Sequence, residues 1–321
     1  MKKMVFFTTV ITVLIFLFFV AAMTGPLTAT PIQILRGLFI EFDPVVAAIY
    51  NMRFPRIFVA LLAGAGISTA GLLLQSLLKN PLADPGMLGI SSTATLSSML
   101  WFIFFPRLIQ LLPIAALIGA LMGFALIYGL AYQENANPTR LILVGIALNA
   151  LMMGLLDVIN GMMGGNLPDG GGINMSFQTW RHVHLLLVYV SIGIGLTVLA
   201  IPTLDLMRLS DQTVTSIGVS VNKRRFYLAF IAALLIGIAS GVVGPIGFLG
   251  LIVPHMAKLM VGQQHKTLIP ATVLLGALTL LLADTVGRTV MAPLEISPSI
   301  VMSMMGGPLL IYLIRRNKRH V

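Results

Sequence analysis

Residues 73–92 read LLQSLLKNPLADPGMLGISS, a stretch in which a short polar turn separates two long apolar runs. Pro81, Pro85 and Gly86 end a helix, because proline lacks a backbone N–H donor and restricts the residue before it. Lys79, Asn80 and Asp84 carry polar side chains that favour water over lipid. The stretch therefore predicts a tight turn outside the lipid, held between two buried helices.

The composition of the whole chain supports membrane spans on both sides of this turn. Of 321 residues, 58% are hydrophobic and 9% are charged, and the mean hydropathy is +0.99. A soluble domain needs far more polar surface to cover its core. The apolar runs are long and continuous, unlike the short alternating segments of a transmembrane barrel. We predict an all-α integral membrane protein that forms one transmembrane domain over residues 1–321.

Hydropathy predicts about ten transmembrane helices. Each apolar run approaches the roughly 20 residues that a span needs, except residues 248–261, which are short but apolar enough to be buried. The N-terminal run mimics a signal peptide but exceeds the usual core of about 7–15 residues, so we interpret it as a retained first span. The predicted spans are 4–23, 55–78, 87–105, 108–131, 140–163, 183–203, 226–244, 248–261, 267–287 and 300–314.

The net charge of +10 comes from basic residues at span ends and in short loops, which does not indicate nucleic-acid binding. With ten spans, fourteen of the Lys and Arg residues fall on the side of both termini and six on the other. The positive-inside rule then places both termini in the cytoplasm. The outer six are Arg36, Arg53, Arg56, Arg107, Arg181 and Arg288.

Three loops stand out by length. Residues 24–54 lie outside and include an amphipathic stretch, IQILRGLFI, and residues 164–182 form an outer glycine-rich loop. Residues 204–225, LDLMRLSDQTVTSIGVSVNKRR, lie inside, and we expect short helices around a turn at Gly218. None of these loops is long enough to form a separate soluble domain.

Motifs for chemistry are missing from the sequence. It contains no phosphate-binding P-loop, no zinc-protease or serine-hydrolase motif, and no cysteine. We predict no catalytic residue, metal site or cofactor in this chain. His182 and His184, alternate residues at a span end, fit an interfacial pair better than a metal site. Asp284 lies four residues before Arg288 on one helix face, so it either neutralises Arg288 or leaves it for an external partner.

Three segments resemble the permease subunits of the iron-siderophore, haem and vitamin B12 ABC importers. They are RFPRIFVALLAGAGISTAGLLLQSLLKNPLADPGMLGISS, VGPIGFLGLIVPH, and LLLADTVGRTVMAPLE with the later GGPLLIYLI. The resemblance covers nearly the whole chain. After Glu295 the usual Glu-Leu-Pro-x-Gly run is replaced by ISPS, and the outer loop GGNLPDGGGINM also departs from the siderophore-permease pattern. Both departures look more like Gram-positive haem permeases.

The resemblance implies a type II importer in the bacterial cell membrane. Its partners would be a second permease subunit (the same chain or a paralogue), two cytoplasmic ATPases that hold ATP and Mg, an extracytoplasmic substrate-binding lipoprotein, and membrane lipid. Arg53, Arg56 and Arg288 match arginines that receive glutamates from the binding protein. The 79–84 turn and residues 204–225 match the elements on which the ATPases dock. The predicted coupling residues are Asn80, Pro81, Asp84, Asp211, Ser216, Gly218 and Val219.

We therefore predict the permease subunit of an ATP-driven importer that moves haem or an iron-siderophore by alternating access. The alternative is an ion-coupled secondary transporter, which needs ion-binding charges near the midplane and often has broken helices in repeated halves. This sequence offers few such charges and no clear repeat. A structural membrane protein without transport would leave the inner loop and the outer arginines unexplained.

Overall fold

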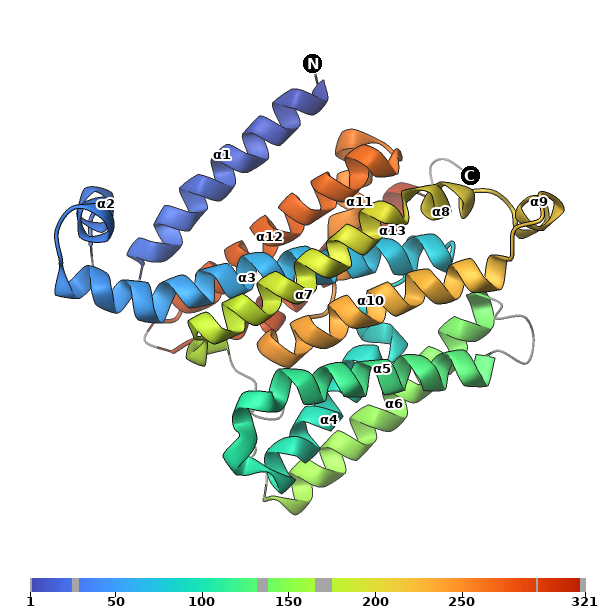
Figure 1. The fold of residues 1–321 in the computed structure, drawn as a ribbon, viewed down its shortest axis with the longest axis horizontal. Helices are drawn as coiled ribbons and strands as arrows, with labels where there is room; N and C mark the ends of the chain where they lie inside the picture. Colours follow the sequence, from blue (N-terminus) through green and yellow to red (C-terminus); the bar gives the residue numbers. More distant parts are fainter. Residues whose placement is uncertain (1, 25–28, 132–137, 165–174, 293, 318–321) are drawn as a thin grey trace.

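The computed structural model describes residues 2–24, 29–131, 138–164, 175–292 and 294–317, and this part of the chain is helical, without strands (Figure 1). The glycine-rich stretch at 165–174 and the last basic residues at 318–321 lie outside it. The α-helices are α1 (Lys2–Met23), α2 (Pro31–Phe39), α3 (Pro44–Leu77), α4 (Ile90–Phe104), α5 (Leu112–Ala131), α6 (Pro138–Met162), α7 (Trp180–Leu199), α8 (Ile201–Leu206), α9 (Asp211–Ser216), α10 (Val221–Val243), α11 (Leu249–Val261), α12 (His265–Thr289) and α13 (Pro298–Asn317). Short 3-10 helices cover Pro85–Leu88, Pro106–Leu111 and Met175–Phe177.

The predicted all-α membrane fold is confirmed. In the described part of the chain, seven helices are long and apolar enough to cross a membrane, and three shorter apolar helices, α4, α11 and α13, bring the number to ten. These ten helices follow the ten predicted spans in order. The amphipathic stretch in the first long loop forms the separate helix α2.

The start of α3 differs from the prediction, which placed a loop up to residue 54. The helix begins at Pro44 and runs for 34 residues, with Pro55 inside it. Asp43 caps this start, because its Oδ1 accepts hydrogen bonds from the backbone N–H groups of Val45 (2.8 Å) and Val46 (3.3 Å). Proline is favoured at the first helical position that Pro44 occupies. At about 1.5 Å per residue, α3 is roughly 50 Å long and exceeds the bilayer core.

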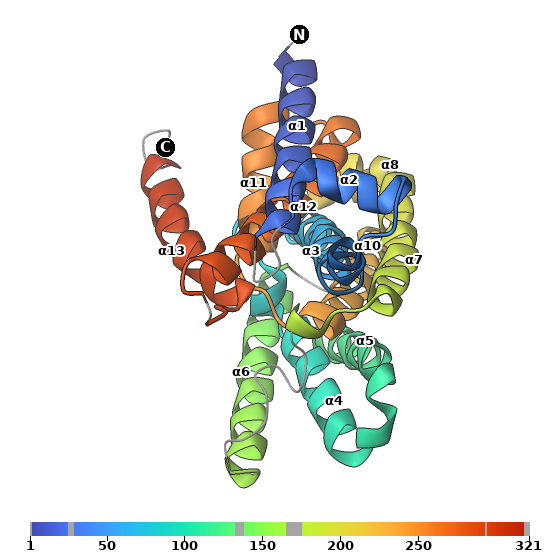
Figure 2. The same cartoon turned by 90° about the vertical axis from the view of Figure 1, so that its left-hand side faces the viewer.

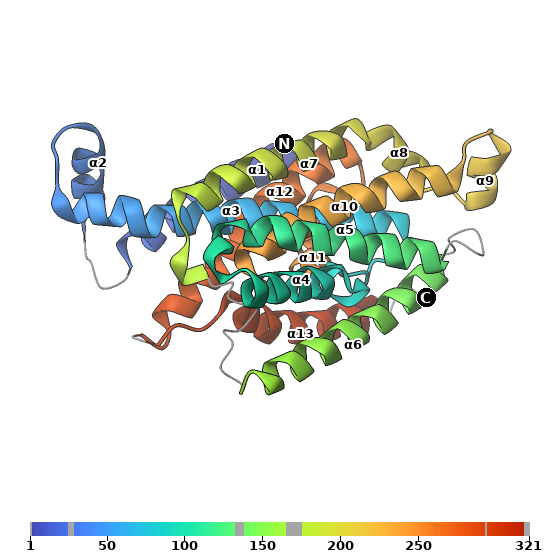
Figure 3. The same ribbon diagram turned by 60° about the horizontal axis from the view of Figure 1, so that its bottom comes forward.

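Helix α3 is the centre of the molecule. It contacts α7, α10, α11 and α12, and Figure 2 looks nearly along its axis, with these helices arranged around it. Most of its side chains from residue 53 onward are buried. On the other side of α10, helices α4, α5 and α6 pack on one another as a second layer (Figure 3).

Small residues allow the backbones around α3 to approach closely. A Cβ atom added at Gly71 would overlap the carbonyl group of Gly250 at the start of α11, and one at Gly64 would overlap the carbonyl group of Gly276 in α12. Ser68, one turn along from Gly64, donates a hydrogen bond to the carbonyl oxygen of Thr272 in α12 at 3.1 Å. Contacts of this kind drive helix association in lipid, where apolar side chains gain little by leaving the solvent.

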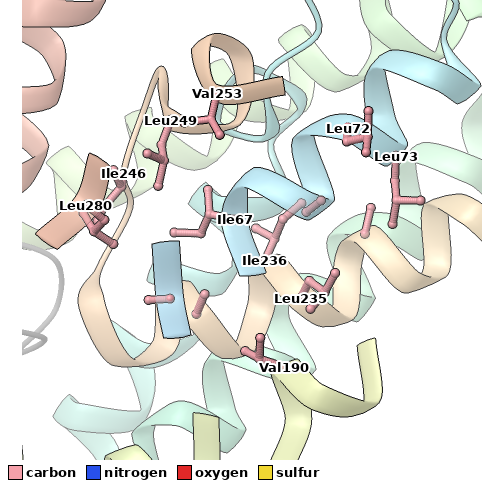
Figure 4. Packing of buried hydrophobic residues seen from close by; sticks show 14 of the residues in the cluster. Ile67, Leu72, Leu73, Val190, Leu235, Ile236, Ile246, Leu249, Val253 and Leu280 are labelled. Atoms are coloured by element: carbon pink, nitrogen blue, oxygen red, sulfur yellow. The ribbon is translucent and has the colours of Figure 1, made fainter. Parts of the chain in front are cut away.

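Branched and long aliphatic side chains fill the space between these close contacts. Figure 4 shows Ile67 of α3 beside Ile236 of α10, and Leu72 of α3 belongs to the same continuous cluster of buried apolar residues. Leu249 and Val253 of α11 extend this cluster on the other side of α3. The result is a densely packed block that holds α3 in a fixed position.

The backbone contact between α3 and α11 gives a direct test of this packing. Gly71→Ala should push the two helices apart and destabilise the fold by about 1–3 kcal/mol, the usual range for overpacking. Gly129→Ala in α5 is the matched control, because an added Cβ there meets no atom within 4 Å. Thermal unfolding in detergent should show a lower midpoint temperature for Gly71→Ala than for the wild type. Gly129→Ala should not lower the midpoint. Equal midpoints for the two variants would contradict the packing described here.

Candidate functional site

Polar side chains gather at the two ends of the long helices. We call the end with Arg53, Arg56 and Arg288 the arginine end, and the end with the 79–84 turn, α8 and α9 the loop end. Helix α3 connects them, since Arg53 and Arg56 lie in its third and fourth turns and Lys79 lies two residues beyond its last residue, Leu77. The N-terminal turn of α1 lies at the loop end, because Lys3 Nζ is 3.4 Å from Oε1 of Gln264, the residue before α12.

At the arginine end, Arg56 is the centre of an ion-pair cluster. Its Nη2 lies 2.8 Å from Asp284 Oδ1 in α12, and its Nε lies 3.0 Å from the same oxygen. Its Nη1 lies 2.8 Å from Glu295 Oε2 in the segment between α12 and α13. Arg56 and Asp284 are both buried, with exposures of 6% and 0%. A buried carboxylate needs such pairing, because an isolated charge in this environment costs several kcal/mol.

The other two arginines hold the end of α1. Arg53 Nη1 donates a hydrogen bond to the carbonyl oxygen of Ala22 at 2.9 Å, and Arg288 Nη2 lies 3.4 Å from that of Ala21. Arg288 Nε also pairs with Asp284 Oδ2 at 3.2 Å. The three predicted docking arginines thus lie together, but all are largely buried within this chain. Of the two possibilities left open for Arg288, the pair with Asp284 is present, and Arg56 shares the same carboxylate.

Glu295 is the solvent-facing member of this cluster, and it was not among the site residues predicted from the sequence. Its side chain is 43% exposed, and its Oε2 accepts hydrogen bonds from Arg56 and, at 2.6 Å, from the hydroxyl of Ser176. Burial acts to raise the pKa of Glu295, but the Ser176 hydroxyl and the Arg56 guanidinium outweigh it and hold that pKa below its usual value. The group that this cluster exposes to solvent is therefore the carboxylate of Glu295, and the arginines lie buried beneath it.

At the loop end, Asp211 joins the two segments predicted to couple to an ATPase. Its Oδ1 lies 2.7 Å from Lys79 Nζ in the 79–84 turn, and its Oδ2 lies 2.7 Å from Arg225 Nη2 at the start of α10. Arg225 Nε in turn donates to the carbonyl oxygen of Leu77, the last residue of α3. Partial burial raises the pKa of Asp211, but the Lys79 and Arg225 contacts dominate and lower it. Asp211 therefore remains charged and ties α9 to the end of α3.

The segment predicted at 204–225 contains short helices, as expected, namely the end of α8 and the whole of α9, but Gly218 does not separate these two helices. Gly218 follows α9 with φ +79°, so it ends the second short helix rather than separating the two. Glycine adopts this left-handed conformation without the steric cost that other residues pay. Ser216, Ile217 and Gly218 are exposed, and Val219 is half-buried. The end of α9 thus presents a surface that another protein could contact.

The 79–84 turn is only partly solvated, which corrects the prediction for one of its residues. Pro81 is exposed, and Asn80 is half-buried, with its Oδ1 accepting a hydrogen bond from the backbone N–H of Leu82 at 2.9 Å. Asp84 is buried at 5% exposure, and its Oδ2 caps the following 3-10 helix by accepting a hydrogen bond from the Gly86 N–H at 3.1 Å. Asp84 therefore has a local structural contact and does not face water.

Neither of the two paired histidines faces a metal-binding cluster. The described residues contain no group of three or more His, Cys, Asp or Glu side chains placed to hold a metal ion. His182 Nδ1 accepts a hydrogen bond from the backbone N–H of Thr179 at 3.3 Å and so caps the start of α7. This contact fits the interfacial interpretation of His182.

The comparisons with known proteins agree with this architecture. The chain matches the FecCD transport family over residues 13–316. It is 35% identical over 325 residues to the probable heme-iron transport system permease protein IsdF of Staphylococcus aureus strain Newman, with 99% of this chain and 98% of the relative covered. IsdF of strain MSSA476 is 34% identical over 321 residues, with the same coverage.

Two solved structures share the fold. A chain assigned to a metal-chelate type ABC transporter in an inward-facing conformation has a TM-score of 0.83 at 24% identity, covering 97% of this chain and 99% of that one. PsaBC from Streptococcus pneumoniae, in complex with Fab, has a TM-score of 0.55 at 14% identity, covering 88% of this chain and 95% of the other. The arrangement of helices is therefore the one that these two solved structures share.

The apolar helices, together with the matched family and relatives, show a multi-pass membrane permease. The chain belongs to the FecCD transport family, and its role is that of an ABC importer permease. An ion-coupled secondary transporter does not fit this membership.

Asp84 gives a prediction for the dependence of stability on pH. Burial raises its pKa from 3.8 to about 6, although hydrogen bonds from the backbone N–H groups of Gly86 and Phe248 act to lower it. The folded state then binds this proton more tightly than the unfolded state. The resulting contribution to the free energy of unfolding is fully present below about pH 4 and is lost as the pH rises through about 6.

Asp84→Asn should remove this loss. The pKa of Asp84 is raised by about two units, and each unit corresponds to about 1.4 kcal/mol. The free energy of unfolding of the variant should therefore rise by up to roughly 3 kcal/mol relative to the wild type between about pH 4 and pH 7. Thermal unfolding in detergent across this range measures the effect, with the exposed Asp157→Asn as control. A constant difference between Asp84→Asn and the wild type at all pH values would show that Asp84 does not titrate in this window.

Proposed function

We propose that this chain is the permease subunit of an importer that moves haem, or a closely related iron chelate, into the bacterial cytoplasm. The support for haem is the 35% identity to IsdF along nearly the whole of both chains. In this proposal the permease provides the path through the membrane, and two separate ATPases, which hold ATP and Mg, supply the energy. A second permease subunit and an extracytoplasmic binding lipoprotein complete the complex.

The observation that carries the mechanism is that a single helix, α3, connects both polar ends. Arg56 near its start pairs with α12 and with Glu295, and Leu77 at its other end accepts a hydrogen bond from Arg225. We place the loop end in the cytoplasm, where the exposed end of α9 and the 79–84 turn would dock an ATPase. Because Asp211 ties both segments to α3, a movement of the ATPase would reach α3 as a rigid-body displacement.

The substrate assignment is tested by growth with defined iron sources. A strain lacking the gene should lose growth on haem as the sole iron source, and the wild-type chain should restore it. Gly218→Val should not restore growth, because valine is strained at φ +79° and the end of α9 would change shape. Gly195→Val, at an exposed helical position where an added Cβ meets nothing within 4 Å, is the matched control.

Each possible result of this growth test has a distinct meaning. Growth of the deletion strain on haem, together with failure on a ferric siderophore, would contradict the choice of haem. Normal growth on every iron source would remove the assignment to iron uptake. Full restoration by Gly218→Val would contradict the role of α9 in coupling.

At the arginine end we propose that Arg53, Arg56 and Arg288 form the docking site for the binding protein, through carboxylates on that partner. Arginine is suited to such planar, two-pronged pairing. Glu295 already occupies one side of Arg56 in this chain. A carboxylate of the binding protein would therefore have to replace Glu295, or share Arg56 with it.

Glu295→Gln should accordingly strengthen association with the binding protein. The gain should reach up to about fivefold, since a partly exposed ion pair contributes about 1 kcal/mol or less, and it should be larger at low salt. Arg56→Gln should weaken association, and Glu41→Gln, which removes an exposed carboxylate elsewhere in the outer loop before α3, should change it little. Charge reversal of Arg56 is less suitable, because it would place three carboxylates together and endanger folding.

Surface plasmon resonance with the permease in nanodiscs measures these affinities at two salt concentrations. Weaker binding by Glu295→Gln would mean that Glu295 itself contacts the partner or orients Arg56 for it. Unchanged binding by both Glu295→Gln and Arg56→Gln would show that the docking assignment is wrong.

A further inference from the structure

A cavity of about 860 Å³ lies at the loop end, between the last turn of α3, the α8 region, α11 and the start of α12. Figure 1 shows these four elements meeting on one side of the molecule, away from α4, α5 and α6. The end of α9, which carries the proposed coupling surface, is not part of its lining. The cavity therefore needs an explanation of its own.

Basic side chains dominate the polar part of this cavity. Lys79, Arg208, His255, Lys258 and His265 line it, against Asp205 as its acidic residue. Asp205 Oδ1 lies 2.6 Å from His265 Nδ1, so that carboxylate is already engaged. Lys79 is paired with Asp211, as described above. Arg208 and Lys258 remain as the two cations for which the described part of the chain offers no carboxylate within ion-pair distance.

The contacts of these two cations leave hydrogen-bond donors available. Arg208 Nη2 lies 3.4 Å from Gln263 Oε1, a long contact to a neutral amide. Lys258 Nζ donates to Gln75 Oε1 at 2.9 Å. Gln75 is fixed in this orientation, because its Nε2 donates to the carbonyl oxygen of Leu251 at 3.1 Å and the residue is buried. An ammonium has three donors and a guanidinium five, so most donors of both groups are free to bind an anion.

The rest of the lining is apolar. Leu204, Met207 and Leu268 are buried in the wall, while Leu209 and Leu259 are 43% and 62% exposed. Leu259 lies on α11, one of the ten apolar helices, next to Lys258 in its last turns. A ligand that suits this cavity combines an anionic group with an adjoining apolar portion. Basic pockets between the cytoplasmic ends of transmembrane helices are suited to anionic lipid headgroups.

We propose that this cavity binds the phosphate group of an anionic phospholipid, held between Arg208 and Lys258, with the acyl chains leaving along Leu259. Arg208 lies between α8 and α9, whereas Lys258 lies on α11. A bound phosphate would thus join the 204–225 segment, which carries Arg208, to the packed helix α11, which carries Lys258. This site is independent of which compound the permease carries.

Binding is tested on the full-length chain purified in detergent and stripped of lipid. Thermal unfolding is followed while short-chain phosphatidylglycerol, short-chain phosphatidylcholine or inorganic phosphate is added at constant ionic strength. Phosphatidylglycerol should raise the unfolding midpoint more than the other two additives. Arg208→Gln and Lys258→Gln should each weaken its apparent affinity about fivefold, the factor that corresponds to about 1 kcal/mol per basic residue.

Lys266→Gln is the matched control, because Lys266 is exposed at the same end of the molecule but does not line the cavity. It should keep the affinity of the wild type. An equal loss in Lys266→Gln would show that the lipid responds to overall charge and would overturn the proposal. Equal stabilisation by inorganic phosphate would overturn the lipid assignment. An unchanged lipid response in Arg208→Gln and Lys258→Gln, together with loss of ATPase copurification, would identify the cavity as an ATPase contact instead.

Discussion

The contact of the α3 backbone with its neighbours, through Gly64 against Gly276 and Gly71 against Gly250, is the constraint on which the other features depend. In a membrane, helices gain little from burying apolar surface, so close backbone contact and interhelical hydrogen bonds determine how they associate. At Gly71 the approach leaves no room for even one methyl group. Because α3 is fixed between α7, α10, α11 and α12, its two ends have defined positions relative to each other.

Both ends of α3 then use buried charge in the same way. At one end Arg56 binds Asp284 and Glu295, and at the other Arg225 binds Asp211 beneath the exposed loop. In each case a buried guanidinium holds a half-exposed carboxylate, which links a surface segment to a core helix. Removing one partner of such a pair is costly, because the remaining charge loses its compensation. The surface segments are thereby coupled mechanically to the packed block.

The sequence predicted the spans well and the polar contacts poorly, for a physical reason. Hydropathy is a local property, so even the short apolar run that forms α11 could be placed. The early start of α3 was also encoded locally, in the Asp43–Pro44 cap, but the polar residues that follow concealed it. The pair of Asp284 with Arg288 could be predicted from the sequence because the two residues lie one helical turn apart. Its second partner, Arg56, is 228 residues away, and no local pattern reports such a contact.

The proposed transport mechanism requires the loop end to face the cytoplasm and the arginine end to face outward. Because the chain has no cysteine, single substitutions can report this directly. Ile217→Cys, 57% exposed after α9, and Phe42→Cys, 80% exposed before α3, place one thiol at each end. A membrane-impermeant maleimide should label Phe42→Cys in intact protoplasts and Ile217→Cys only after permeabilisation. Labelling of Ile217→Cys in intact protoplasts, with Phe42→Cys protected, would contradict the account.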